Sequence, residues 1–171
     1  LVSRAFALPD PRSYGSGNPG ATNVLRTGRK VPAVLTLLGD ALKGWVAVFV
    51  AQRYGADPVI ASAAAGLAVV IGHVLPVFHG FAGGKGVSTA AGALFGLSVW
   101  LGLGTLATWI VIAVFFRISS LAALISAISA PVFTLMLFDW RHPYLVAVCG
   151  IAVVLLIRHN VTETRQGRRG S

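Results

Sequence analysis

The residues best suited to chemistry lie in Gly72–Ser88, the stretch GHVLPVFHGFAGGKGVS, which joins two apolar segments. Gly83, Gly84 and Gly86 surround Lys85 there. Because glycine leaves the backbone unrestricted, several N–H groups can point into one concavity that suits an anion. A lysine adds the point charge that often holds a phosphate. The competing interpretation is a glycine-rich turn between membrane helices, with its lysine marking the cytoplasmic side.

The stretch is not a nucleotide-binding P-loop. That motif needs a glycine where this chain has His79, and Ser or Thr after the lysine, where it has Gly86. His73 lies about one turn before the loop. It is a candidate catalytic group, but a histidine in a membrane segment is more often a hydrogen-bonded structural residue.

A second cluster, SGNPGATNVLR, occupies Ser16–Arg26. Its small polar candidates for substrate contact are Ser16, Asn18, Thr22 and Asn23. Arg26 adds a planar fork that fits phosphate or carboxylate. A capped loop with an ordinary arginine is the alternative, but small polar residues without a nearby acid favour an anion site.

Three further charged features lie near the ends of apolar segments. Asp40 and Lys43 are three residues apart on one expected helix, either as a structural ion pair or as a charged wall of the site. The second feature is the turn Arg117–Ser120, and the third is Arg158–Asn160, which contains His159. Both are equally typical of basic residues that only mark the cytoplasmic side.

Several catalytic patterns are absent. The sequence has neither a His-x4-Asp nor an HExxH pattern, nor an aspartate-rich cluster, so we expect no metal and no cofactor. Its one cysteine, Cys149, lies in an apolar run and is expected to be a buried, inert thiol. Phosphate-binding groups with almost no general base suggest a reaction whose leaving group is already activated.

Composition identifies the surroundings of these residues. Of the 171 residues 56% are hydrophobic and 11% are charged, whereas soluble domains carry about 25% charged residues. The mean hydropathy is +0.79. We therefore expect one integral-membrane domain, an all-α polytopic transmembrane helical bundle, and no nucleic-acid partner despite the net charge of +9.

The apolar pattern predicts six spans, and a long apolar run containing several glycines is divided into two short helices. The expected spans are Pro32–Tyr54, Pro58–Pro76, Val87–Val99, Leu101–Phe116, Leu121–Phe138 and Pro143–Ile157. Proline excludes a long helix from the first thirty or so residues. The basic tail, residues 158–171, is expected to fray.

Basic residues separate strongly between the two sides of this arrangement. One side holds Arg4, Arg12, Arg26, Arg29, Lys30, Lys85, Arg117, Arg158, Arg165, Arg168 and Arg169. The other holds Arg53 and Arg141, each near an acid. The positive-inside rule then predicts that the polar clusters face the cytoplasm.

The stretches SGNPGATNVLRTGRK and GHVLPVFHGFAGGKGVSTAAG, with the terminal Arg158–His159, resemble the three motifs of the bacterial acyl-phosphate-dependent glycerol-3-phosphate acyltransferases, the PlsY family. The resemblance covers nearly the whole chain. It implies a seven-helix inner-membrane enzyme, so we expect a first helix ahead of Leu1. The third motif departs from the family's Arg-His-Arg-x-Asn, which leaves either Asn160 or Thr162 at the asparagine's place.

The resemblance implies transfer of a fatty acyl group from acyl phosphate to the sn-1 hydroxyl of glycerol 3-phosphate, giving lysophosphatidic acid and phosphate. Its motifs imply catalytic roles for Lys85, Arg26, His73, Ser16 and His159. They imply substrate contacts for Asn18, Thr22, Asn23, Gly83, Gly84, Gly86, Ser120, Asp40 and Lys43. The expected partners are glycerol 3-phosphate, fatty acyl phosphate and the bilayer, with the chain a monomer.

The proton acceptor is left open between a substrate phosphate, His73 and His159. A small anion transporter, with Asp40 and Lys43 as coupling pair, is the alternative function. A transporter predicts inverted repeats and a midplane site. The sequence instead contains no evident repeat and concentrates its anion-binding residues on one face.

Overall fold

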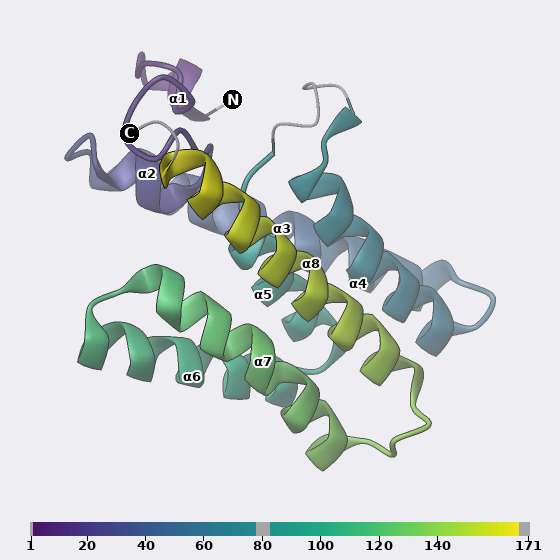
Figure 1. Ribbon diagram of the computed structural model, residues 1–171. Coiled ribbons are helices and arrows are strands. Elements are labelled where there is room, and N and C mark those ends of the chain that lie inside the picture. The colour runs from purple at the N-terminus through teal and green to yellow at the C-terminus, as the bar shows by residue number, and fades with distance from the viewer. Residues whose placement is uncertain (1, 78–82, 168–171) are drawn as a thin grey trace.

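The structure is a computed structural model that describes residues 2–77 and 83–167. The described residues form a helical bundle without strands (Figure 1). The helices are α1 (Val2–Ala5), α2 (Ala21–Leu25), α3 (Lys30–Tyr54), α4 (Pro58–Val74), α5 (Val87–Leu97), α6 (Val99–Phe116), α7 (Ser119–Leu137) and α8 (Pro143–Gly167). The predicted all-α class is confirmed, and the proline-rich start contains only the short helices α1 and α2.

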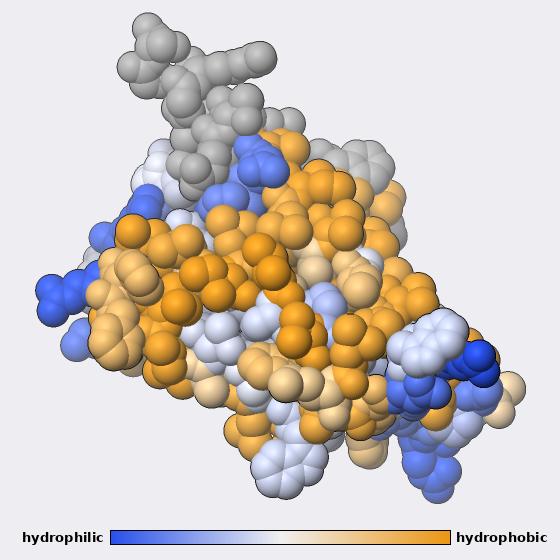
Figure 2. Space-filling view, turned by 60° about the horizontal axis from the view of Figure 1, so that its bottom comes forward, coloured by the Kyte–Doolittle hydropathy of each residue, from blue (hydrophilic) through white to orange (hydrophobic). Residues whose placement is uncertain are grey.

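Each predicted span corresponds to one helix. Within the described residues, α3, α6, α7 and Pro143–Val161 of α8 are long and apolar enough to cross a membrane, whereas α4 and α5 are shorter apolar helices. Figure 2 shows a broad hydrophobic surface with hydrophilic residues gathered at two opposite ends. Cys149 is exposed on α8, so the expectation of a buried thiol was wrong.

Two boundaries differ from the sequence prediction. The long apolar run breaks at Ser98, which is extended (φ −160°, ψ 131°), and not at a glycine. The Ser98 hydroxyl accepts a hydrogen bond from the Leu101 N–H (3.5 Å) and so caps α6. At the other boundary, α8 continues past Ile157 to Gly167, so the start of the tail is helical where fraying was expected.

Glycines bring α3 and α5 into backbone contact. A Cβ atom at Gly92 would overlap the carbonyl oxygen of Ala41 and lie 2.6 Å from its carbonyl carbon. On the facing helix, a Cβ atom at Gly44 would overlap the carbonyl oxygen of Thr89. Small residues allow this approach in membranes, where packing replaces the hydrophobic effect between helices. The contact sets the position of α5 and of the loop before it.

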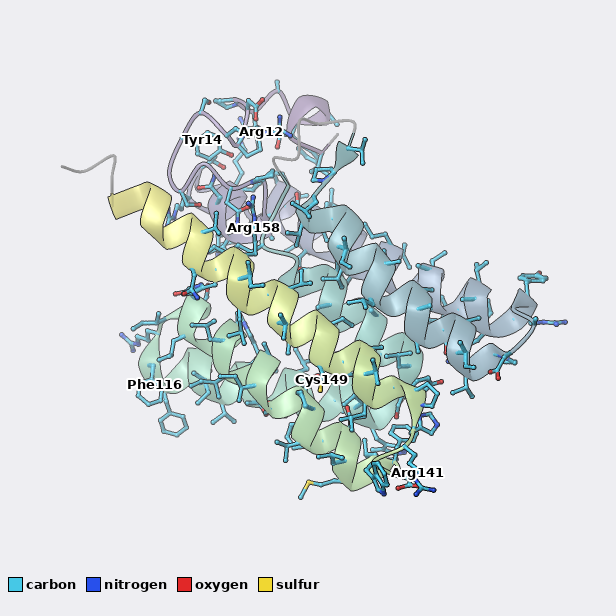
Figure 3. The ribbon with its side chains drawn as sticks, turned by 45° about the vertical axis from the view of Figure 1, so that its right-hand side comes forward. Arg12, Tyr14, Phe116, Arg141, Cys149 and Arg158 are labelled. Atoms are coloured by element: carbon cyan, nitrogen blue, oxygen red, sulfur yellow. The ribbon has the colours of Figure 1, made fainter. Side chains whose placement is uncertain are left out.

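The charged residues gather at opposite ends of the bundle. Arg12, Tyr14 and Arg158 lie near one end and Arg141 near the other (Figure 3). The loop before α5 and the last turns of α8 lie at the same end as α1 and α2 (Figure 1). We call this end the motif end. Gly80, Arg168 and Arg169 lie outside the described residues.

Gly92→Ala is expected to lower the unfolding midpoint of the detergent-solubilised protein, because the added methyl group must push α3 and α5 apart. Overpacking of this kind costs about 1–3 kcal/mol. Gly39→Ala is the matched control, since a Cβ atom at Gly39 on α3 would have no neighbouring atom within 4 Å. The control should be neutral or slightly stabilising. Equal midpoints for the two variants would contradict the close contact.

Candidate functional site

The first motif loop is organised around the buried side chain of Asn23. Its Oδ1 accepts the Ser16 N–H (3.0 Å), and its Nδ2 donates to the carbonyl oxygens of Pro11 (2.7 Å) and Tyr14 (3.1 Å). Gly15 adopts a positive φ of 58°, and a Cβ atom there would overlap Asn23 Oδ1. One amide therefore closes the loop.

This arrangement changes the expected role of Asn23. The sequence suggested a substrate contact, but the amide makes its hydrogen bonds inside the loop. Thr22 on α2 and Arg26 directly after it are exposed, and Ser16 and Asn18 are half-buried in the loop. Asn23 shapes the loop, whereas the other four residues are not fully buried.

The second motif loop packs tightly on the end of α4. A Cβ atom at Gly83 would overlap the carbonyl oxygen of His73 and lie 2.6 Å from that of Val74. Gly86 adopts φ 83°, in the left-handed region that favours glycine, immediately before α5 begins. The glycines are thus required by close packing as well as by backbone conformation. Lys85 lies among them, half-buried.

Arg158 on α8 holds this second loop from the other side. Its Nη2 donates to the carbonyl oxygen of Gly83 (2.7 Å), and its Nε donates to that of Gly84 (3.4 Å). From sequence alone, Arg158 had no more than the appearance of a topology signal. Its position beside His159 in the third motif was the available indication of a role.

A charged network lies beneath the loop. Lys43 Nζ is 2.6 Å from Asp40 Oδ1 and 2.5 Å from His73 Nδ1. The buried Thr89 hydroxyl lies 3.2 Å from the same ring nitrogen. The predicted Asp40–Lys43 pair is therefore present, and it reaches His73, which sequence spacing alone did not indicate.

The remaining predicted residues are less closely placed. His159 is half-buried and Asn160 exposed on α8, while the Thr162 side chain lies outside the described residues. Ser120 is the second residue of α7 (Ser119–Leu137), beside the turn after Phe116. Figures 1 and 3 show that turn apart from α2 and the loop before α5. The structure thus brings His73 and the glycine loop together but not Ser120.

This end of the bundle is chemically suited to bind phosphate. Arg26, Lys85 and Arg158 supply positive charge, and Asp40, the acid that contacts Lys43 among the described residues, is already paired with it. In the part of the chain that the structure describes, no group of three or more His, Cys, Asp or Glu residues is arranged to hold a metal.

Comparisons with known proteins agree along the whole chain. The family model described as Glycerol-3-phosphate acyltransferase matches residues 1–167. The glycerol-3-phosphate acyltransferase of Ralstonia pickettii (strain 12J) is 56% identical over 98% of this chain and 83% of the relative. That of Thiobacillus denitrificans (strain ATCC 25259 / T1) is 55% identical over 99% of this chain and 90% of the relative.

Solved structures agree with the sequence comparison. The glycerol 3-phosphate form of PlsY, an integral membrane glycerol 3-phosphate acyltransferase, has a TM-score of 0.83 and 36% identity, covering 96% of this chain and 82% of that chain. The lysophosphatidic acid form has a TM-score of 0.82 and 35% identity, covering 98% and 85%. This chain belongs to the glycerol-3-phosphate acyltransferase family.

Proposed function

We propose that this protein transfers a fatty acyl group from acyl phosphate to the sn-1 hydroxyl of glycerol 3-phosphate, releasing lysophosphatidic acid and phosphate. The observation that carries the proposal is the pair of motif loops at one end of a membrane bundle. The loops contribute Arg26 and Lys85, and Arg158 holds the second loop by two carbonyl oxygens. Family membership supports the same reaction.

The chemistry needs little beyond binding and charge stabilisation. Acyl phosphate is a mixed anhydride, so the hydroxyl of glycerol 3-phosphate attacks the acyl carbon, the new ester bond forms and the acyl–phosphate bond breaks. The proton lost by the hydroxyl passes to a substrate phosphate or to a histidine. Lys85 and Arg26 neutralise phosphate charge, and the loop N–H groups and the Ser16 hydroxyl stabilise charge that develops in the transition state. Holding both substrates together supplies proximity.

The positions of the basic residues indicate how the protein is oriented in the membrane. We assign the motif end to the cytoplasmic side of a bacterial inner membrane because the basic residues concentrate there. One substrate is then soluble and the other is a lipid that reaches the site from the bilayer. The chain acts as a monomer in this proposal.

The direct test is the purified protein in detergent with palmitoyl phosphate and glycerol 3-phosphate. We expect phosphate release matched mole for mole by lysophosphatidic acid, and little release when glycerol 3-phosphate is omitted. Palmitoyl-CoA in place of palmitoyl phosphate should give no product. Absence of product from the acyl phosphate would refute the proposed donor.

Lys85→Ala is expected to reduce kcat/KM by about ten- to hundredfold. The loss removes a charged hydrogen bond to phosphate, which contributes about 1.5–3 kcal/mol, and about 1.4 kcal/mol corresponds to a factor of ten. Arg53→Ala is the control, because Arg53 is an exposed cation near the C-terminal end of α3, outside the three motifs. Turnover of Lys85→Ala within about twofold of the unaltered protein would show that the loop does not bind phosphate through this residue.

Arg158→Lys is expected to lower kcat/KM by about tenfold or more while keeping the charge. Lysine lacks the planar fork that donates to both the Gly83 and Gly84 carbonyl oxygens, so the loop loses its support. Arg53→Lys, an exposed arginine near the opposite end, should leave activity unchanged. Unaltered kinetics in Arg158→Lys would mean that charge alone suffices there.

A further inference from the structure

The two ring nitrogens of His73 face different surroundings. Nδ1 lies 2.5 Å from Lys43 Nζ and 3.2 Å from Thr89 Oγ1. Nε2 points the other way and is the atom that a Cβ at Gly84 would overlap, with Cε1 at 3.2 Å. One nitrogen therefore contacts the charged network and the other contacts the glycine loop.

The contact with Lys43 determines which nitrogen carries the proton. An ammonium group has donors and no acceptor, so Nδ1 must offer its lone pair. Nδ1–H cannot donate to Asp40, because Asp40 Oδ1 lies 3.7 Å from Nδ1, beyond hydrogen-bond range. Nδ1–H directed at Thr89 Oγ1 is also disfavoured, because it would leave no lone pair for the ammonium group 2.5 Å away. Asp40 instead lies 2.6 Å from Lys43 Nζ and accepts from it.

Charge also disfavours a fully protonated ring. Burial disfavours the charged ring, and an imidazolium would also place two cations in contact, with Arg158 adding further positive charge nearby. The Asp40 carboxylate favours the charged ring, but it is already paired with Lys43. The His73 ring is therefore neutral. Because Nδ1 accepts from Lys43, the single ring proton is assigned to Nε2. Nε2–H faces the backbone beside Lys85.

We propose that Asp40 and Lys43 hold His73 as the neutral tautomer with its proton on Nε2, so that His73 gives a hydrogen-bond donor, and not a base, to the phosphate bound at Gly83–Gly86. This inference rests on the proposed phosphate role of that loop. Asp40 and Lys43 are positioning residues in this arrangement, because they act through the ring. The ring adds a neutral donor to the loop N–H groups and the Lys85 charge.

The assignment narrows the search for the proton acceptor. Of the histidines that the structure describes, His142 precedes α8 at the end opposite the motif loops, and His73 has its lone pair engaged by Lys43. Among the described residues, His159 on α8 is then the histidine able to accept the hydroxyl proton, and the substrate phosphates are the other candidates.

The tautomer is measurable without turnover. In protein labelled with 15N-histidine, with His73 assigned by its loss in His73→Gln, we expect at neutral pH an unprotonated Nδ1 and a protonated Nε2. Lys43→Met should convert this pattern into a mixture of tautomers. A protonated Nδ1 in the unaltered protein, as the other tautomer or as an imidazolium, would overturn the proposal.

The donor role is tested by adding a ligand to the same sample. Glycerol 3-phosphate or inorganic phosphate should shift the His73 Nε2 signal and leave that of His142 in place. An unmoved Nε2 signal with a saturating ligand would refute the donor role. This readout is independent of acyl transfer, so a failed acyltransferase assay would be distinguishable from a failure here.

Two substitutions separate donor from base by their kinetics. A glutamine amide nitrogen reaches the place of Nε2, whereas an asparagine nitrogen reaches only that of Nδ1. We expect His73→Gln to keep kcat within about tenfold and His73→Asn to lose about a hundredfold, the usual effect of removing one transition-state donor. His142→Gln is the matched control and should not change kcat. Equal losses in both His73 variants would count against the donor, as would a better asparagine variant.

Discussion

The motif end depends on hydrogen bonding of backbone carbonyl groups that water does not reach. Gly83 and Gly84 are buried, and their carbonyl oxygens accept from one side chain, that of Arg158. An unsatisfied buried carbonyl costs about 1–3 kcal/mol. By satisfying both, Arg158 keeps an irregular loop stable between two helices and places positive charge beside Lys85. The loop is thus anchored by α8 while α4 and α5 shape its ends.

Close packing of glycines supports this anchor. The contact between α3 and α5 at Gly44 and Gly92 brings Asp40 and Lys43 near the end of α4, where His73 lies. Gly84 is also closely packed, because a Cβ atom there would overlap the imidazole ring of His73. Glycine therefore has two uses in this protein: it allows helices to approach, and it allows a ring nitrogen to approach a loop. In both cases the missing side chain allows Asp40, Lys43 and His73 to lie close to the second motif loop.

Much of the site was accessible from sequence. The two motif loops, the Asp40–Lys43 pair and the concentration of basic residues at one end follow from residue types and local spacing, and the structure agrees with the pairing and with the shared end. The break at Ser98 was missed because a glycine-rich run suggests many breaks, whereas one capping hydroxyl selects the actual position. The hydrogen bonds of the Asn23 amide inside the loop were not predicted, because a polar residue in a loop does not reveal which way its amide faces.

Sequence by itself determined the class of the protein, an all-helical membrane enzyme of one family, because hydropathy and motif spacing are local properties of the chain. Only the tertiary structure decided that Arg158 supports the second loop, that Lys43 reaches across to His73 and that the turn between α6 and α7 lies apart from the motif loops. These contacts join residues on different helices, and their distances depend on how closely the helices pack. The glycine contacts between backbones set how closely the helices pack. The hydrophobic periodicity of a single helix does not predict which glycines of two helices will meet.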